Sequence, residues 1–314
     1  MSLSETRYKL NTGAEIPALG FGTWQSAPGE VSKAVYHALK TGYRHIDTAQ
    51  CYDNETEVGE GINRALSEGL VQRSEIFVTT KLWSTYHTRV EEALNLSLSK
   101  LGLDYVDLYL VHWPLAMNPN GNHELFPKLP DGSRDLVRSH SHVTTWKSLE
   151  ELIARNPDKV RAIGVSNYSR LYLEELIPQV AVVPAVNQIE NHPALPQQEI
   201  VDYCKEKGIL VTAFSPLGST GSPLFSAPAI VEVATRTGVR PATVLLSWHL
   251  ARGSAVLAKS VTPSRIEENR KLVALDQEDV DLIDKYSAEL AATTGFQRYV
   301  YPPFGVNFGF PDKQ

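Results

Sequence analysis

Cysteine is scarce in this sequence. The 314 residues include two cysteines, Cys51 and Cys204, and neither belongs to a CxxC pair. A disulfide framework is therefore excluded, and the sequence gives no indication of a cysteine zinc site or a thioredoxin-like redox site. Such sparse use of cysteine is typical of a reducing compartment, so we expect a cytoplasmic protein.

Long hydrophobic runs and an excess of positive charge are also missing. No segment holds the roughly 18 charge-free apolar residues of a membrane span, and the first residues lack the apolar core of a signal peptide. Thirty basic and 36 acidic side chains give a formal charge of −6. Because no positive field is available to attract a phosphate backbone or an anionic membrane, we expect neither nucleic acid nor membrane as a partner.

Several nucleotide-binding and hydrolytic motifs are absent. The nearest approach to GxGxxG, at 59–61, has Arg64 where the third glycine belongs, so a Rossmann half is unsupported. GxxxxGK[ST], HExxH and GxSxG do not occur, which disfavours nucleotide hydrolysis, zincin chemistry and α/β-hydrolase chemistry. We expect 140–142, His-Ser-His, in a solvated loop rather than at a metal, because no carboxylate or thiol is spaced with it.

What the sequence does contain is an alternation of short apolar runs with amphipathic segments. The apolar runs are 18–24, 43–47, 76–81, 106–112, 161–166, 185–189, 210–214 and 255–259. The segments with helical spacing are 31–39, 57–66, 90–101, 146–154, 171–177, 199–205 and 242–250. Eight buried strands alternating with helices predict an α/β fold, a (β/α)₈ TIM barrel, formed by residues 1–314 as one domain.

Three segments exceed what a minimal barrel needs. Residues 8–10 and 14–16 flank an Asn-Thr-Gly turn and predict an N-terminal β-hairpin that plugs the bottom of the barrel. Residues 114–142 form a long loop after the fourth strand, expected to be a lid or binding loop. The aromatic tail after residue 292 is expected to fold over the active site.

Polar residues end the apolar runs. Asp47, Lys81 and His112 close three successive runs, at the strand ends that meet at the mouth of a barrel and supply its catalytic groups. A half-buried acid and base placed there must pair, because an unpaired buried charge costs several kcal/mol. Tyr52 follows the second run, and we expect Lys81 to lower the pKa of its phenol while Asp47 holds the ammonium group.

Three motifs resemble the signatures of the aldo-keto reductase family. The first comprises 47–49, Tyr52, 54–55 and 58–59, the second is Ile-Gly-Val-Ser-Asn at 163–167, and the third is 259–269. They occur in order and cover nearly the whole chain. The resemblance implies a catalytic tetrad of Asp47, Tyr52, Lys81 and His112, in which Tyr52 is the proton donor and His112 orients the substrate.

The resemblance also implies an NADP(H) site. The nicotinamide carboxamide would be held by Ser166, Asn167 and Gln188, with Phe214 stacked on the ring. Thr262 precedes Pro263 as a helix N-cap, and Lys259 and Arg265 near it favour NADP over NAD through the 2′-phosphate. The full set of implied cofactor-binding residues is Thr23, Trp24, Ser166, Asn167, Gln188, Phe214, Ser215, Leu217, Ser219, Lys259, Ser260, Val261, Thr262, Arg265, Glu268 and Asn269.

The expected substrate is a small carbonyl compound or polyol. Residues at or beside strand ends would line its pocket: Trp24, Cys51, Trp83, His112 and Trp113. Within the family, 20–26 and 299–308 resemble NADP-dependent glycerol dehydrogenases and glyceraldehyde or erythrose reductases, which implies reversible NADPH-dependent reduction of small aldehydes and ketones by a monomer.

Three alternatives stay open. A uronate or xylose-type sugar reductase is the first, and a uronate would need a cation, for which Lys128, Arg134, Arg138 and Arg298 are candidates on loops of unassigned position. A Schiff-base aldolase with Lys81 as nucleophile is the second. A non-catalytic NADPH-binding sensor is the third.

Overall fold

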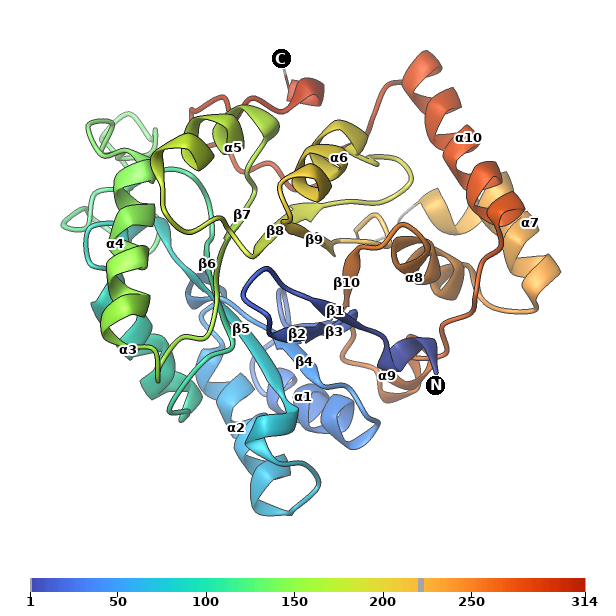
Figure 1. Cartoon of the computed structure of the whole chain (residues 1–314), viewed down its shortest axis with the longest axis horizontal. Coiled ribbons are helices and arrows are strands. Elements are labelled where there is room, and N and C mark those ends of the chain that lie inside the picture. The colour runs from blue at the N-terminus through green and yellow to red at the C-terminus, as the bar shows by residue number, and fades with distance from the viewer. Residues whose placement is uncertain (1, 220–222, 314) are drawn as a thin grey trace.

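The computed structural model describes residues 2–219 and 223–313 and contains the predicted barrel (Figure 1). Its eight parallel strands close in the order β10-β3-β4-β5-β6-β7-β8-β9. Their bounds are β3 (Leu19–Gly22), β4 (His45–Asp47), β5 (Phe77–Leu82), β6 (Leu108–Val111), β7 (Ile163–Ser166), β8 (Val186–Glu190), β9 (Leu210–Phe214) and β10 (Ala255–Ala258). Each apolar run coincides with one of these strands to within a few residues at its ends, so the predicted fold is confirmed.

Helices surround the barrel. They are α1 (Val31–Lys40), α2 (Glu55–Ser67), α3 (Val90–Leu101), α4 (His142–Arg155), α5 (Arg170–Leu176), α6 (Gln198–Glu206), α7 (Pro228–Thr237), α8 (Pro241–Ala251), α9 (Pro263–Glu268) and α10 (Gln277–Thr293). The spacing of apolar residues did not lead us to expect α7 and α10, which pack on each other and on α8. None of the described helices is both long and apolar enough to cross a membrane.

Burial explains why these segments form strands and helices. All six residues of β5 are buried, as expected for a parallel strand covered on both faces. In α1, the buried residues Val31, Ala34, Val35 and Ala38 follow the three- and four-residue spacing of one helix face. The core therefore lies between the barrel and its ring of helices.

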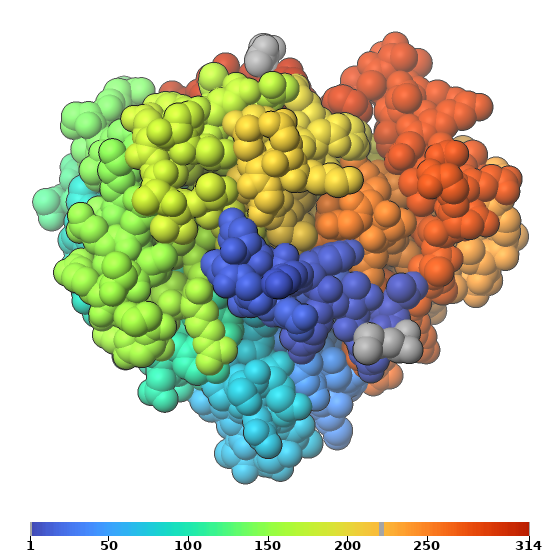
Figure 2. Space-filling view, in the orientation of Figure 1, coloured from blue at the N-terminus to red at the C-terminus, as the bar shows by residue number. Residues whose placement is uncertain are grey.

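An N-terminal hairpin closes one end of the barrel, as predicted. Strands β1 (Arg7–Lys9) and β2 (Glu15–Pro17) are antiparallel, and Leu10 and Ile16 are buried in a cluster with strand residues such as Leu108. Figure 1 shows the hairpin across the centre of the barrel, and Figure 2 shows it filling that face. The opposite, carboxyl ends of the strands are left for the functional site.

The expectation of a solvated loop at 140–142 is wrong for His142, whereas His140 and Ser141 precede the helix and Ser141 is exposed. Ser141 is the N-cap of α4, and its side chain accepts a hydrogen bond from the Val143 amide at 3.1 Å. His142 begins the helix and is buried, with its ring centroid 5.0 Å from that of Tyr172. Aromatic residues on α5 and on the loop before α5 bury His142. Because they are distant from His142 in the sequence, its burial could not be predicted from neighbouring residues.

Gly164 marks a close approach between two strands. A Cβ placed on Gly164 in β7 would lie 2.7 Å from Cδ2 of Leu110 and 2.7 Å from the backbone oxygen of Val186. The Val186 oxygen is a backbone atom of the neighbouring strand β8, so it cannot move away without disturbing the sheet. Only glycine fits this position without displacement.

Gly164→Ala should therefore lower stability by about 1–3 kcal/mol, the usual cost of forcing an extra methyl group into a packed core. Gly22→Ala on β3 is the matched control, because a Cβ there would meet nothing closer than 3.7 Å. Thermal unfolding followed by circular dichroism should show a lower midpoint for Gly164→Ala than for Gly22→Ala. Equal midpoints would contradict this account of β7.

Candidate active site

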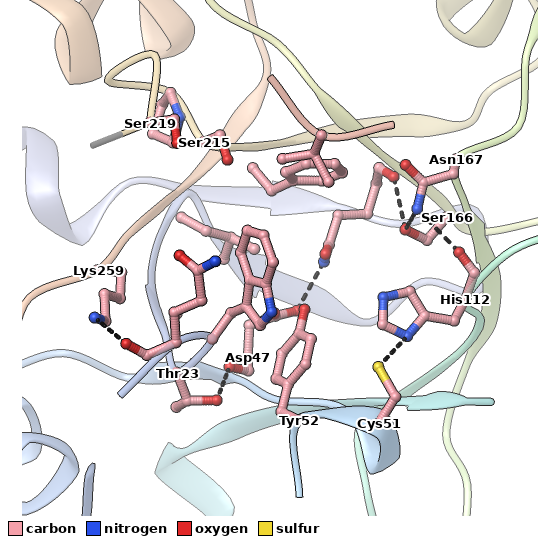
Figure 3. Close-up of a pocket in the computed structure, with 18 of the residues that line it drawn as sticks. Thr23, Asp47, Cys51, Tyr52, His112, Ser166, Asn167, Ser215, Ser219 and Lys259 are labelled. Atoms are coloured by element: carbon pink, nitrogen blue, oxygen red, sulfur yellow. Dashed lines mark hydrogen bonds between the residues drawn. The ribbon is translucent and has the colours of Figure 1, made fainter. Parts of the chain in front are cut away.

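A cavity of about 560 Å³ opens at the carboxyl ends of the barrel strands. Strand ends and the loops that follow them supply its lining, including Asp47, Tyr52, His112 and Gln188. In Figure 3, Lys259, Ser215 and Ser219 lie toward one side of this cavity and His112 toward the other. The strand ends therefore converge as the sequence predicted.

A buried ion pair lies at the base of the cavity. The Lys81 Nζ donates to Asp47 Oδ1 at 2.7 Å, to the Thr48 carbonyl oxygen at 2.8 Å and to Tyr52 Oη at 3.3 Å. The other Asp47 oxygen accepts from Gln188 Nε2 at 2.7 Å. Every proton of the ammonium group thus has an acceptor, which is what a charge with no solvent contact requires.

The phenol of Tyr52 points into this arrangement, but its pKa differs from our expectation. Burial, followed by the negative charge of Asp47, raises the pKa of Tyr52 well above its usual value of 10. The prediction of a lowered pKa is wrong for this structure, because desolvation of the buried phenol and the negative charge of Asp47 both oppose the phenolate. Tyr52 is consequently a protonated phenol, the form a proton donor must have.

His112 is neutral, and one of its ring nitrogens has a cysteine neighbour. Burial, reinforced by the charge of Lys81, lowers the pKa of His112 well below 6.5. Burial also raises the pKa of the Cys51 thiol, whose Sγ lies 3.4 Å from His112 Nδ1 (Figure 3). We assign the protonated thiol as the donor and Nδ1 as the acceptor, which places the proton of the neutral imidazole on Nε2.

The rings place His112 beside the phenol. The centroids of Tyr52 and His112 are 5.7 Å apart, and that of Trp83 is 5.2 Å from His112. Asn167 Nδ2 donates to the His112 carbonyl oxygen at 3.0 Å and so ties the end of β6 to the end of β7. The arrangement presents two neutral donors, a phenol and an imidazole, in a largely apolar cavity.

The structure brings most of the expected cofactor residues together. Those lining the cavity are Thr23, Trp24, Ser166, Asn167, Gln188, Phe214, Ser215, Leu217, Ser219, Lys259, Ser260, Val261, Thr262 and Arg265. Glu268 and Asn269 do not line it, and Glu268 instead pairs with Arg240 at 2.7 Å. The expected contact of these two residues with a cofactor therefore has no support in the cavity.

The two sides of this lining differ in chemistry. Asn167 Oδ1 and Gln188 Oε1 accept no hydrogen bond within the described part of the chain, so both can receive the NH₂ of a carboxamide. Lys259 donates to the Gln25 carbonyl oxygen at 2.9 Å, and Arg265 forms no ion pair with a described residue. Thr262 is the N-cap of α9, as predicted, but its hydroxyl caps no backbone amide and is free for a ligand.

Aromatic residues line the rest of the cavity. All five predicted pocket residues are there, namely Trp24, Cys51, Trp83, His112 and Trp113. The loop after β6 adds Phe126 and Arg134, and the tail adds Val300, Pro302 and Phe304. The tail thus covers the mouth as expected, and Phe304 packs against Trp113 with centroids 5.5 Å apart.

Sequence reasoning missed the residue that holds the tail. Glu190 ends β8 and has no solvent exposure, and its two carboxylate oxygens accept from the backbone amides of Tyr299 and Val300, both at 2.8 Å. His192 Nε2 lies 3.0 Å from the same carboxylate. The position of Glu190 at a strand end was a signal in the sequence. However, nothing in the sequence relates this charge to a tail more than 100 residues later.

The fold and the site together define a barrel enzyme in which donors at the strand ends face a long cavity. Residues 18–288 match the model of the aldo/keto reductase family, and the chain belongs to this family. It is thus an oxidoreductase.

Named relatives cover almost the whole chain. It is 60% identical over 308 residues to a D-galacturonate reductase of Hypocrea jecorina, covering 98% of this chain and 99% of the relative. It is 48% identical to glycerol 2-dehydrogenase (NADP(+)) of Saccharomyces cerevisiae, covering 95% of each. The aldose reductase of Schistosoma japonicum superposes with a TM-score of 0.85 at 37% identity, covering 93% of this chain and 98% of that structure. The expected resemblance is confirmed.

Cys51→Ala should reduce kcat about two- to ten-fold, because a single hydrogen bond that selects a tautomer contributes about 0.5–1.5 kcal/mol. Cys51→Ser is the matched control, since a hydroxyl can also donate to Nδ1, and its activity should stay near that of the wild type. Steady-state turnover of a small aldehyde measures both variants. An equal loss in the two variants, or no loss in Cys51→Ala, would contradict the role assigned to the thiol.

Proposed function

We propose that this protein is an NADPH-dependent reductase of small aldehydes and ketones, reversible in the manner of a glycerol dehydrogenase. The observation that carries the proposal is the pairing of a protonated Tyr52 with a neutral His112 at the end of a cavity whose other residues suit a nicotinamide dinucleotide. A reduced nicotinamide, when bound, supplies a hydride to the carbonyl carbon.

The residues of the chain would then handle the charge that develops on the carbonyl oxygen. Tyr52 Oη–H donates its proton to that oxygen as the negative charge grows. Lys81, hydrogen bonded to Tyr52 at 3.3 Å, stabilises the phenolate that remains, while Asp47 keeps the ammonium group in place. The Nε2–H of His112 donates a second hydrogen bond to the substrate oxygen and orients it.

The residues fit the cofactor in two separate ways. Free amide oxygens on Asn167 and Gln188 suit a carboxamide, and the ring of Phe214 offers a face for stacking. Lys259 and Arg265 supply positive charge where a 2′-phosphate would favour NADP over NAD. The 48%-identical yeast relative is named as NADP-dependent, which supports the same choice.

The aldolase alternative loses support. A Schiff-base lysine needs a free amine that can reach a carbonyl carbon. The Nζ of Lys81 has no solvent exposure and three hydrogen-bond acceptors, one of them a carboxylate. Lys81 therefore acts behind Tyr52 and is not itself presented to the cavity.

Sugar acids are a second candidate substrate class. The relative with 60% identity over nearly the whole chain is named a D-galacturonate reductase. We propose that the site accepts a sugar chain of several carbons as well as glyceraldehyde, since its cavity of about 560 Å³ is long and lined by aromatic rings.

Tyr52→Phe tests the proton-donor role. The variant should lose turnover of DL-glyceraldehyde by at least about 100-fold, the usual contribution of a positioned general acid, because the phenyl ring keeps the packing and lacks the proton. NADPH affinity, measured by fluorescence titration, should stay within about two-fold of the wild type and so serves as the folding control. Retained turnover would remove Tyr52 from the mechanism.

Lys259→Ala combined with Arg265→Ala tests cofactor choice. Loss of one or two charge-assisted hydrogen bonds to a 2′-phosphate should raise the Kd for NADPH roughly 10- to 100-fold or more. The Kd for NADH, which lacks that phosphate, is the matched control and should change little. Equal changes for both cofactors would mean that these two cations do not select NADPH.

A further inference from the structure

One arginine in the cavity lacks an anionic partner. Arg134 lies on the loop after β6 and lines the cavity, and its guanidinium forms no ion pair within the described part of the chain. Its one hydrogen bond runs from Nη1 to the backbone oxygen of Phe126, at 3.0 Å. The remaining N–H groups of its planar fork are free to bind a ligand.

The surroundings of Arg134 favour an anionic ligand. The guanidinium carbon lies 5.3 Å from the ring centroid of Phe126 and 6.0 Å from that of Phe304. Aromatic rings exclude water on two sides, so a half-buried cation here interacts strongly with an anion that enters the cavity. Two acids of the same loop do not pair with Arg134: Asp135 accepts from Asn118 at 2.8 Å and Glu124 from Tyr86 at 3.2 Å.

The loop holds this arginine in a defined position. Lys128 and Arg134 face each other in an antiparallel bridge, and the Asp135 amide donates to the Pro127 carbonyl oxygen at 3.2 Å. The indole N–H of Trp83 donates to the Leu125 carbonyl oxygen and ties the loop to the residue that follows β5. A cation on such a loop is preorganised for a ligand.

A chain of rings connects Arg134 with the reactive centre. The Trp83 centroid lies 5.2 Å from His112 and 5.3 Å from Phe126, and Phe126 is the ring that Arg134 faces. Two rings therefore separate the imidazole from the guanidinium. A molecule that bound Arg134 through an anionic group and His112 through its carbonyl oxygen would lie along these rings.

The other three candidate cations do not compete for this role. Arg298 is paired with Asp312 at 2.7 Å, and its side chain is 1% exposed. Lys128 and Arg138 are exposed, and neither lines the cavity. The remaining lysine and arginine among the described lining residues, Lys259 and Arg265, are those assigned to the cofactor phosphate.

From these contacts we propose that Arg134 binds the carboxylate of the substrate, and that the preferred substrates are sugar aldehydes with a terminal carboxylate, that is, aldouronates. This inference rests on the proposed reductase function. The fork of Arg134 pairs with the two carboxylate oxygens while the aldehyde end of the sugar reaches Tyr52 and His112.

The test compares substrates that differ only in charge. D-Galacturonate, its methyl ester and D-galactose share one sugar skeleton, and only the first carries a carboxylate. The wild type should have a kcat/KM for galacturonate at least ten-fold above those for the ester and for galactose, and 0.5 M NaCl should reduce this preference because the cation is half-buried.

Arg134→Gln should lower kcat/KM for galacturonate roughly 10- to 100-fold, mainly through KM, as expected for the loss of a charge-assisted hydrogen bond that binds substrate and transition state alike. Values for the ester and for galactose should change less than about two-fold. Arg138→Gln, an exposed arginine on the same loop, is the matched control and should behave as the wild type with all three substrates.

Three results would overturn the inference. An equal loss on all three substrates would mean that Arg134 only positions the loop, and no loss on galacturonate would place the carboxylate elsewhere. A wild type that reduces glyceraldehyde but prefers galactose or the ester would also refute it while leaving the proposed reductase intact. Absence of NADPH-dependent turnover with any of these aldehydes would instead refute the proposed function itself.

Discussion

The ion pair of Lys81 with Asp47 is the interaction on which the site depends. Two opposite charges lie buried at the carboxyl ends of β5 and β4, and hydrogen bonds to both groups offset their desolvation. The pair is hydrogen bonded to Tyr52 on one side and to Gln188 on the other, and Gln188 lies on β8, halfway around the barrel from β4. Removing either charge would leave the other uncompensated in the core.

The distribution of charge along the cavity follows from this arrangement. At the centre, Asp47 balances the charge of Lys81, and burial keeps Tyr52 and His112 neutral. Uncompensated positive charge remains away from that centre, on Lys259 and Arg265 and, two rings beyond His112, on Arg134. A cofactor and a substrate that each carry an anionic group at the far end, and that react with each other at neutral groups in between, would match this distribution of charge. The proposed cofactor and substrate have that character.

Much of this was accessible from the sequence, because buried parallel strands are continuous apolar runs whose polar ends are easy to recognise. Asp47, Lys81 and His112 were predicted on that basis, and the three signatures extended the prediction to the cofactor side. Helix α10 could have been found as well, from the spacing of Val280, Ile283 and Leu290.

The features that sequence reasoning missed or left undecided depend on contacts between distant segments. Glu190, which was missed, holds a tail more than 100 residues away. Arg134 was one of four candidate cations, and it is distinguished from the others only when Phe126 and Phe304 come together around it. The direction of the Tyr52 pKa was mispredicted for the same reason. The proximity of Lys81 to Tyr52 could be anticipated from the strand order. The burial of the Tyr52 phenol, which raises its pKa, could not.

Transfer of a labelled hydride tests the central claim most directly. The protein would be incubated with DL-glyceraldehyde and NADPH carrying deuterium at C4 of the nicotinamide, with each face labelled in turn, and the product analysed by mass spectrometry. The account predicts glycerol with one deuterium, on the former aldehyde carbon, from one of the two labelled forms and none from the other. Glycerol without deuterium from both forms, or no glycerol at all, would contradict it.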